Sequence, residues 1–118
     1  MASDFRLDRP IMELATTVPK PKRVIDCAAG YGKWGFLFTR SFRLKQRPEL
    51  IAVDVWPVYV GDLRNIADHA LIASSSALPF CDGSFGLGFL CEVIEHPDQR
   101  DGELSIREIQ RVFDSLLD

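Results

Sequence analysis

The fold of this chain is decided by residues 23–35, which read RVIDCAAGYGKWG. An apolar run ends at Asp26, a loop of small residues follows, and an amphipathic segment begins near Gly32. A strand–loop–helix turn of this composition lets a ligand approach backbone N–H groups, because small side chains leave them uncovered. Asp54 ends the next apolar run, where an acid that binds a ribose is expected. Together these features predict a site for a nucleotide-like cofactor.

Short apolar runs alternate with amphipathic segments along the rest of the chain. We expect strands over 23–27, 50–53, 70–73 and 85–91, and helices over 8–18 and 32–46. A last helix is expected to begin at a capping box formed by Ser105 and Glu108. Its apolar face would comprise Ile106, Ile109, Val112, Phe113, Leu116 and Leu117. The alternation predicts an α/β fold, an open parallel sheet with helices on both faces.

The composition is that of one ordinary globular domain. With 118 residues, 47% of them hydrophobic and 26% charged, the chain is expected to form a single domain over 1–118. The net charge of −3 argues against a general attraction to nucleic acid or to anionic membranes. We find neither a signal-peptide pattern nor an apolar run of membrane length. The sequence therefore predicts a cytoplasmic protein with no nucleic-acid or membrane partner.

The cysteines and histidines do not predict a metal site. Cys27, Cys81 and Cys91 lack C-x-x-C spacing, and His69 and His96 are the only histidines. Two of the three cysteines lie within or at the end of predicted buried strands, where cysteine acts as a small apolar side chain, and we expect reduced thiols.

The glycines of the first loop allow a second interpretation. Gly30, Gly32 and Gly35 fit the G-x-G-x-x-G pattern of dinucleotide-binding proteins, and Asp54 follows at a suitable distance. Asp26 counts against a dinucleotide, because its carboxylate would repel a pyrophosphate and would suit an ammonium group better. A dinucleotide-dependent oxidoreductase is thus the third and weakest functional alternative.

Two motifs resemble a known family. Residues 24–32, VIDCAAGYG, resemble the D-x-G-x-G-x-G motif of class I S-adenosylmethionine-dependent methyltransferases. Residues 77–85, ALPFCDGSF, and 91–96, CEVIEH, resemble the L-P-F-x-D-x-S-F-D and V-L-E-H runs of the type 11 subfamily. The resemblance implies a Rossmann-like sheet in the order 3-2-1-4, S-adenosylmethionine as cofactor, and a fold shortened after the fourth strand and its following helix.

The resemblance also implies roles for the matching residues. Asp26 and the backbone around Ala28, Gly30 and Gly32 would hold the amino-acid end of the cofactor. Asp54 would accept hydrogen bonds from both ribose hydroxyls. A structural alternative for Asp54 is that it caps the following turn.

Further matching positions would surround the adenine and the acceptor. Val55 would pack on the adenine. Ser74 and Ser75 would bond to the adenine edge, at the place where the family has Asp-Ala. Alternatively, the two serines satisfy local backbone groups. Cys91 would line the methionine moiety. The weak candidates for a catalytic role, facing the substrate, are Glu92, Glu95 and His96. Trp34 and Trp56 are expected in the core.

The sequence therefore predicts a methyltransferase that acts on an unidentified small-molecule acceptor. The main alternative is a non-catalytic or partner-dependent S-adenosylmethionine-binding remnant or scaffold, which leaves the enzymatic activity open. Without a fifth strand, Leu87, Phe89 and Leu90 would lie on an exposed sheet edge. We expect self-association or a partner chain to cover that edge.

Overall fold

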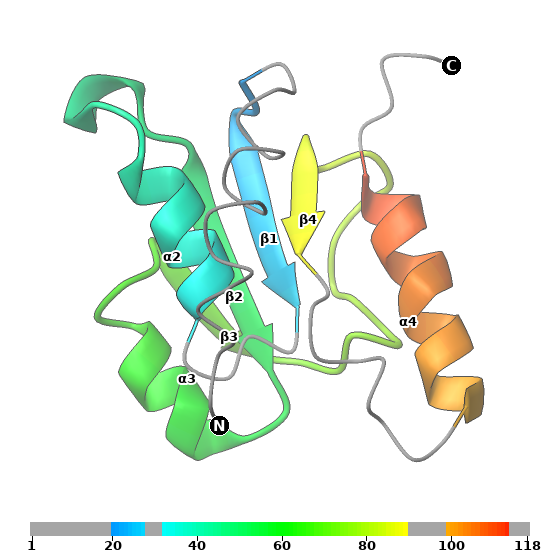
Figure 1. Ribbon diagram of the computed structural model, residues 1–118. Helices are drawn as coiled ribbons and strands as arrows, with labels where there is room; N and C mark the ends of the chain where they lie inside the picture. Colours follow the sequence, from blue (N-terminus) through cyan, green and yellow to red (C-terminus); the bar gives the residue numbers. More distant parts are fainter. Residues whose placement is uncertain (1–19, 28–31, 90–98, 114–118) are drawn as a thin grey trace.

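An open parallel sheet lies between helices on both of its faces (Figure 1). The structure is a computed structural model that describes residues 20–27, 32–89 and 99–113. The helix predicted over 8–18 lies outside these residues. Helices α2 and α3 cover one face of the sheet and α4 covers the other, which confirms the predicted α/β architecture.

The sheet has the predicted order, β3-β2-β1-β4, with all neighbours parallel. Its strands are β1 (Arg23–Cys27), β2 (Glu49–Asp54), β3 (His69–Ile72) and β4 (Leu87–Phe89). In the register of the two central strands, Cys27 lies opposite Val53, so Asp54 extends one residue beyond the end of β1. The acids that end the two apolar runs are therefore brought to the same edge of the sheet.

Helix α2 (Lys33–Arg40) is shorter than the predicted segment 32–46. Its last carbonyls are occupied by side chains: the Ser41 hydroxyl donates to the carbonyl of Phe38 (2.6 Å), and Arg47 donates to that of Thr39 (3.2 Å). Such bonds compete with continuation of the helix. The chain continues through a 3₁₀ turn, η1 (Leu44–Gln46), into β2.

Helix α4 (Gln99–Val112) begins six residues before the predicted capping box, so Ser105 lies in its interior and the capping box is wrong. The predicted apolar face is also partly wrong. Ile106 is 47% exposed and Phe113 is 42% exposed, whereas Ser105 is buried with Val112. Leu116 and Leu117 lie outside the described residues.

Strand β4 begins at Leu87, two residues after the predicted start at Phe85. Phe85 is held by α4 instead, since its N–H donates to the carbonyl of Val112 (2.9 Å). Among the described strands β4 lies at the edge of the sheet, as expected, because it pairs only with β1. The two described apolar side chains expected on this edge nevertheless pack against the core. Phe89 is only 6% exposed, and both it and Leu87 pack in the cluster beneath α2. Leu90 lies outside the described residues.

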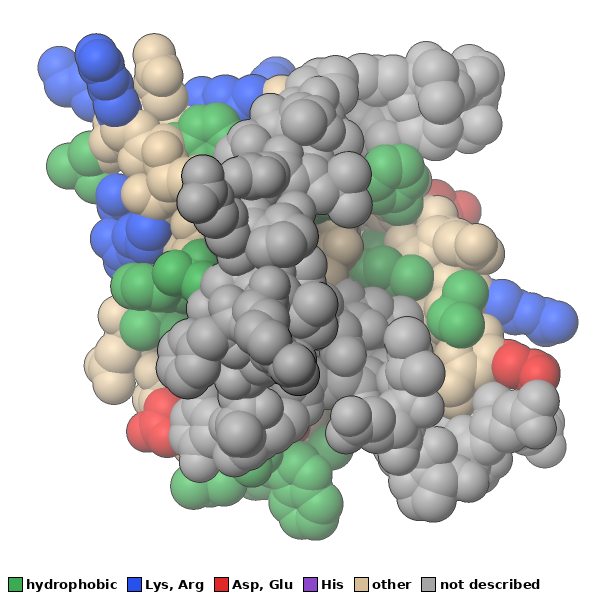
Figure 2. Space-filling model, in the orientation of Figure 1, with side chains coloured by type: hydrophobic (Ala, Val, Ile, Leu, Met, Phe, Trp, Pro, Cys, Tyr) green, Lys and Arg blue, Asp and Glu red, His purple; other side chains and the backbone are tan. Residues whose placement is uncertain are grey.

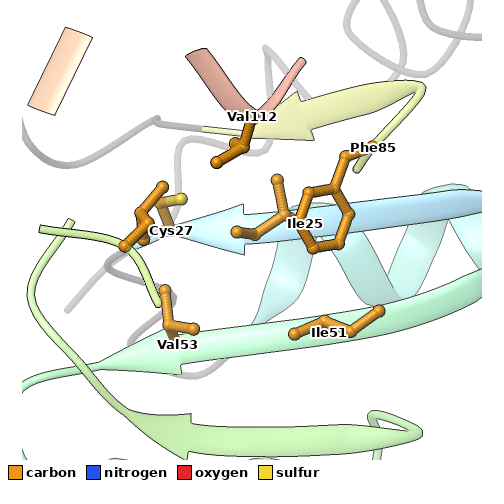
Figure 3. Close-up of a cluster of buried hydrophobic side chains, with 7 residues drawn as sticks. Ile25, Cys27, Ile51, Val53, Phe85 and Val112 are labelled. Carbon is orange, nitrogen blue, oxygen red and sulfur yellow. The ribbon is translucent and has the colours of Figure 1, made fainter. Parts of the chain in front are cut away.

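Alternate residues of the strands form two apolar layers. Val24, Leu50 and Phe89 pack with Phe38 and Trp34 of α2, which confirms the predicted core position of this tryptophan. The opposite layer, beneath α4, is drawn in Figure 3. It comprises Ile25, Cys27, Ile51, Val53, Leu78, Phe85 and Val112.

Close approach of α2 to β1 requires Gly35, and replacing this residue with alanine tests the requirement. A Cβ atom there would lie 2.8 Å from Asp26 Oδ2 and 2.8 Å from Leu50 Cδ1. We expect Gly35→Ala to lower the free energy of unfolding by about 1–3 kcal/mol, as overpacking does, in urea denaturation.

The matched control is Gly61→Ala, in α3 (Pro57–Leu63), where an added Cβ atom meets nothing within 4 Å. Because alanine favours the helix, this change should leave stability unchanged or raise it by up to about 1 kcal/mol. Equal losses in the two variants would contradict the steric argument.

Candidate functional site

Two buried carboxylates lie at the carboxyl end of the central strands. Asp26 is 4% exposed and Asp54 is 5% exposed. Their alternation with Val24 and Ala52 places both on the sheet face that α2 and α3 cover. In open α/β sheets, ligands bind outside the carboxyl ends of the strands, so this edge is the candidate site.

Asp26 accepts a hydrogen bond from the N–H of Gly35 (3.1 Å). This N–H belongs to the first turn of α2, whose donors have no partner within the helix. The N-cap residue, Gly32, offers no side-chain bond, so the strand acid acts in place of a capping side chain. The positive end of the helix dipole also favours the carboxylate. Asp26 thus has a structural role that its position in the sequence did not reveal.

Gly32 adopts a left-handed conformation, with φ of 74°. A Cβ atom at this position would lie 2.6 Å from Leu63 Cδ2 and 2.7 Å from Ile66 Cδ1. Both the backbone angle and the close packing against α3 therefore require glycine. The neighbouring predicted residues of this loop, Ala28 and Gly30, lie outside the described residues.

Asp54 turns the chain at the end of β2. Its Oδ1 atom accepts the N–H of Trp56 (2.9 Å), which is the capping role considered as the structural alternative. Val55 is 51% exposed and Trp56 is 63% exposed, so the predicted core position of Trp56 is wrong. A buried acid is thus followed by two exposed apolar side chains. This is a combination that suits a ligand with a polar sugar and an apolar base.

Ser74 and Ser75 follow β3, beside the end of β2, because Ala73 donates its N–H to the carbonyl of Asp54 (3.1 Å). The Ser74 hydroxyl accepts the N–H of Ser76 (3.2 Å) and lies 2.7 Å from the Ser76 hydroxyl. This is the local role considered for Ser74. The Ser75 hydroxyl instead reaches Ser105 of α4, 2.8 Å away.

The remaining predicted site residues lie outside the described residues: Cys91, Glu92, Glu95 and His96. The two described cysteines, Cys27 and Cys81, are free thiols. Burial raises the pKa of Cys27 far above its ordinary value. The neighbouring carboxylate of Asp26 raises this pKa further, by a smaller amount. The Cys27 thiol is therefore protonated and packs as an apolar group.

A polar contact that the sequence did not predict fastens the segment after Ser75 to α4. The Arg111 guanidinium donates to the carbonyls of Leu78 (3.0 Å) and Phe80 (2.8 Å) and to Asp82 Oδ1 (2.7 Å). It also binds Glu108 (2.6 Å), whose other oxygen accepts the N–H of Leu78 (2.8 Å). The only sequence signal was the helical spacing of the two charged residues.

Positive charge gathers away from the candidate site. Figure 2 shows Lys and Arg side chains at the upper left, over η1 and the end of α2, where Arg40, Arg43 and Lys45 are exposed. This region adjoins the amino ends of the strands. In residues 20–27, 32–89 and 99–113, no His, Cys, Asp and Glu side chains are grouped to hold a metal ion. No helix within these ranges has the length and apolar character needed to cross a bilayer.

Comparison with known proteins identifies the fold through solved structures. No protein-family model and no curated protein sequence matches the chain. The chain is similar to the PH0226 protein of Pyrococcus horikoshii, with 19% identity and a TM-score of 0.72 over 95% of this chain and 54% of that one. It is also similar to a TehB-like S-adenosylmethionine-dependent methyltransferase of Corynebacterium glutamicum, with 16% identity and a TM-score of 0.69 over 96% and 59%.

A third similar structure, from Haloferax volcanii, is a methyltransferase in complex with the Trm112 methyltransferase activator. The identity is 19% and the TM-score is 0.66, over 92% of this chain and 49% of that one. The chain thus spans about half the length of the solved structures that it matches. The fold is the Rossmann-like fold of S-adenosylmethionine-dependent methyltransferases, as the sequence predicted.

The contact between α4 and the segment after Ser75 predicts how stability depends on pH. The hydrogen bond from Arg111, and next the N–H of Leu78, lower the pKa of Glu108 below its ordinary value of 4.5. A depressed pKa stabilises the fold above the ordinary value, and this contribution is lost as the pH falls through the folded value. We expect the melting temperature to fall over this acidic window, and to fall less in Glu108→Gln, which keeps an acceptor for Leu78.

The control is Asp62→Asn, at an exposed position of α3. It should retain the acid sensitivity of the parent protein. Identical pH profiles for Glu108→Gln and the parent would contradict this role of Glu108.

Proposed function

We propose that this domain binds S-adenosylmethionine and transfers its methyl group to a small-molecule acceptor. The observation that supports the proposal is the placement of Asp26 and Asp54, buried on neighbouring strands at the carboxyl edge of a sheet with the methyltransferase strand order. We also retain the type 11 subfamily as a proposal, on the motifs at 77–85 and 91–96. Free thiols at Cys27 and Cys81 favour the reducing cytoplasm as its compartment.

The described residues fit the chemistry of this cofactor. Asp54 is a buried carboxylate whose charge would meet the ribose hydroxyls, and Val55 offers an exposed apolar surface for adenine. Asp26 supplies negative charge for the ammonium group of the methionine end. The loop that includes Ala28, Gly30 and Gly32 would supply backbone donors, Ser74 and Ser75 would meet the adenine edge, and Cys91 would line the methionine moiety.

The cofactor, when bound, supplies an electrophilic methyl group on a sulfonium. The protein would orient the cofactor and the acceptor and exclude water. Such positioning lowers the activation barrier of methyl transfer. An acceptor that must lose a proton would give it to a base on the substrate side of the edge. Glu92, Glu95 and His96 are proposed for that role.

A second proposed function is a cofactor-binding domain that works only with a partner chain. It is favoured by the edge position of β4, which pairs only with β1 among the described strands. One of the similar solved structures, from Haloferax volcanii, is a complex of a methyltransferase with a methyltransferase activator. A dinucleotide-dependent oxidoreductase is the weakest alternative, since Asp26 would oppose a pyrophosphate.

Isothermal titration of the protein and of its Asp54→Asn variant tests the cofactor site. Asparagine keeps an oxygen for the Trp56 N–H but removes the charge that ribose hydroxyls would meet. We expect micromolar binding of S-adenosylhomocysteine to the parent, about −8 kcal/mol. The variant should lose about 1.5–3 kcal/mol of that binding free energy.

Asp62→Asn, at an exposed position of α3, is the control and should bind like the parent. Equal affinity of the Asp54→Asn variant would reject the site. Binding of NAD in preference to S-adenosylhomocysteine would favour the oxidoreductase.

Sedimentation velocity tests whether the edge of β4 is covered by a second copy of the chain. Unpaired strand edges favour association, so we expect the sedimentation coefficient to rise with protein concentration. A monomer at every concentration would exclude a homo-oligomer and leave a partner chain as the proposed cover.

A further inference from the structure

One side of α4 carries three polar residues that hold the segment following β3. Ser105, Glu108 and Arg111 are spaced three apart, so they lie on the same side of the helix. We call these three residues the α4 polar face. Each of them bonds to the segment 75–82. Ser105 bonds to Ser75, and Glu108 bonds to Leu78. Arg111 bonds to Leu78, Phe80 and Asp82.

The segment begins with a tight turn. The N–H of Ala77 donates to the carbonyl of Ser74 (3.1 Å), and the Ser74 hydroxyl accepts the N–H of Ser76 (3.2 Å). These bonds fix the shape of the turn but do not fix its position over the sheet. The hydroxyl of Ser75 leaves the turn and lies 2.8 Å from that of Ser105.

Ser105 is unusual for a residue on the core side of a helix, because it is polar and only 2% exposed. A buried hydroxyl costs stability unless it has a hydrogen-bond partner. Its bond with Ser75 joins residues 30 positions apart in the chain. The bond therefore fixes where the turn sits, in addition to its shape.

We propose that Ser105 is a positioning residue. By bonding to Ser75, it holds the turn at Ser74 and Ser75 in place to meet the adenine edge of the cofactor. The inference rests on the proposed function, because it takes the turn at Ser74 and Ser75 as the adenine-facing part of the site. Glu108 and Arg111 hold the following residues, so the turn cannot slide along α4. Affinity for the cofactor then depends on a helix side chain that does not itself touch the ligand.

A double-mutant cycle on ligand affinity tests the proposal. The dissociation constant of S-adenosylhomocysteine is measured by isothermal titration for the parent, Ser105→Ala, Ser75→Ala and the double variant. We expect Ser105→Ala to weaken binding about threefold to tenfold, the effect of one lost hydrogen bond. In the Ser75→Ala background it should have no further effect, since the bond is already absent.

Gln110→Ala, at an exposed position of α4, is the control and should bind like the parent. Thermal melting checks that each variant is folded. Ser105→Ala should keep the helix, because alanine is favoured in helix interiors. Ser75→Ala removes the same hydrogen bond without changing the helix. Parent-like affinity in Ser105→Ala, or additive losses in the double variant, would overturn the positioning role alone. No binding by the parent would overturn the proposed function and this inference with it.

Discussion

The carboxylate of Asp26 accepts the N–H of Gly35 at 3.1 Å, and this bond seats the first turn of α2 on the end of β1. The contact is possible only because residue 35 has no side chain. Once α2 is seated, its apolar residues cover Val24 and Leu50 and complete one layer of the core. Asp26 itself is held buried at the carboxyl edge of the sheet. A single strand–helix contact thus sets both the packing and the location of the candidate site.

The opposite face depends on a second close approach. A Cβ atom at Gly88 would lie 2.6 Å from Ile109 Cδ1, so the glycine lets α4 pack directly on β4. The same helix then uses Glu108 and Arg111 to bind the backbone of Leu78 and Phe80. These hydrogen bonds hold the backbone of the connection between β3 and β4, which has no helix or strand of its own at Leu78 and Phe80. The segment that follows β3 is therefore ordered by a helix far away in the sequence.

These two packing contacts give the candidate site its mixed character. The buried acids Asp26 and Asp54 come from the central strands, whereas the exposed apolar side chains Val55 and Trp56 come from the turn after β2. The serines after β3 border the same edge. A ligand with an ammonium group, a sugar and an apolar base matches this order of groups, and this match underlies the proposed cofactor.

The sequence determined the strand order through the resemblance of its motifs to class I methyltransferases. It determined the place of the acids because the first two apolar runs end in Asp26 and Asp54, and the carboxyl ends of parallel strands meet at one edge of a sheet. It could not determine where helices stop or which helical side is buried. Those outcomes depend on contacts outside the helix itself: Arg47 donates to the carbonyl of Thr39 in the last turn of α2, and Ser75 bonds to the buried hydroxyl of Ser105. Local periodicity says nothing of such partners, so only the tertiary structure decided them.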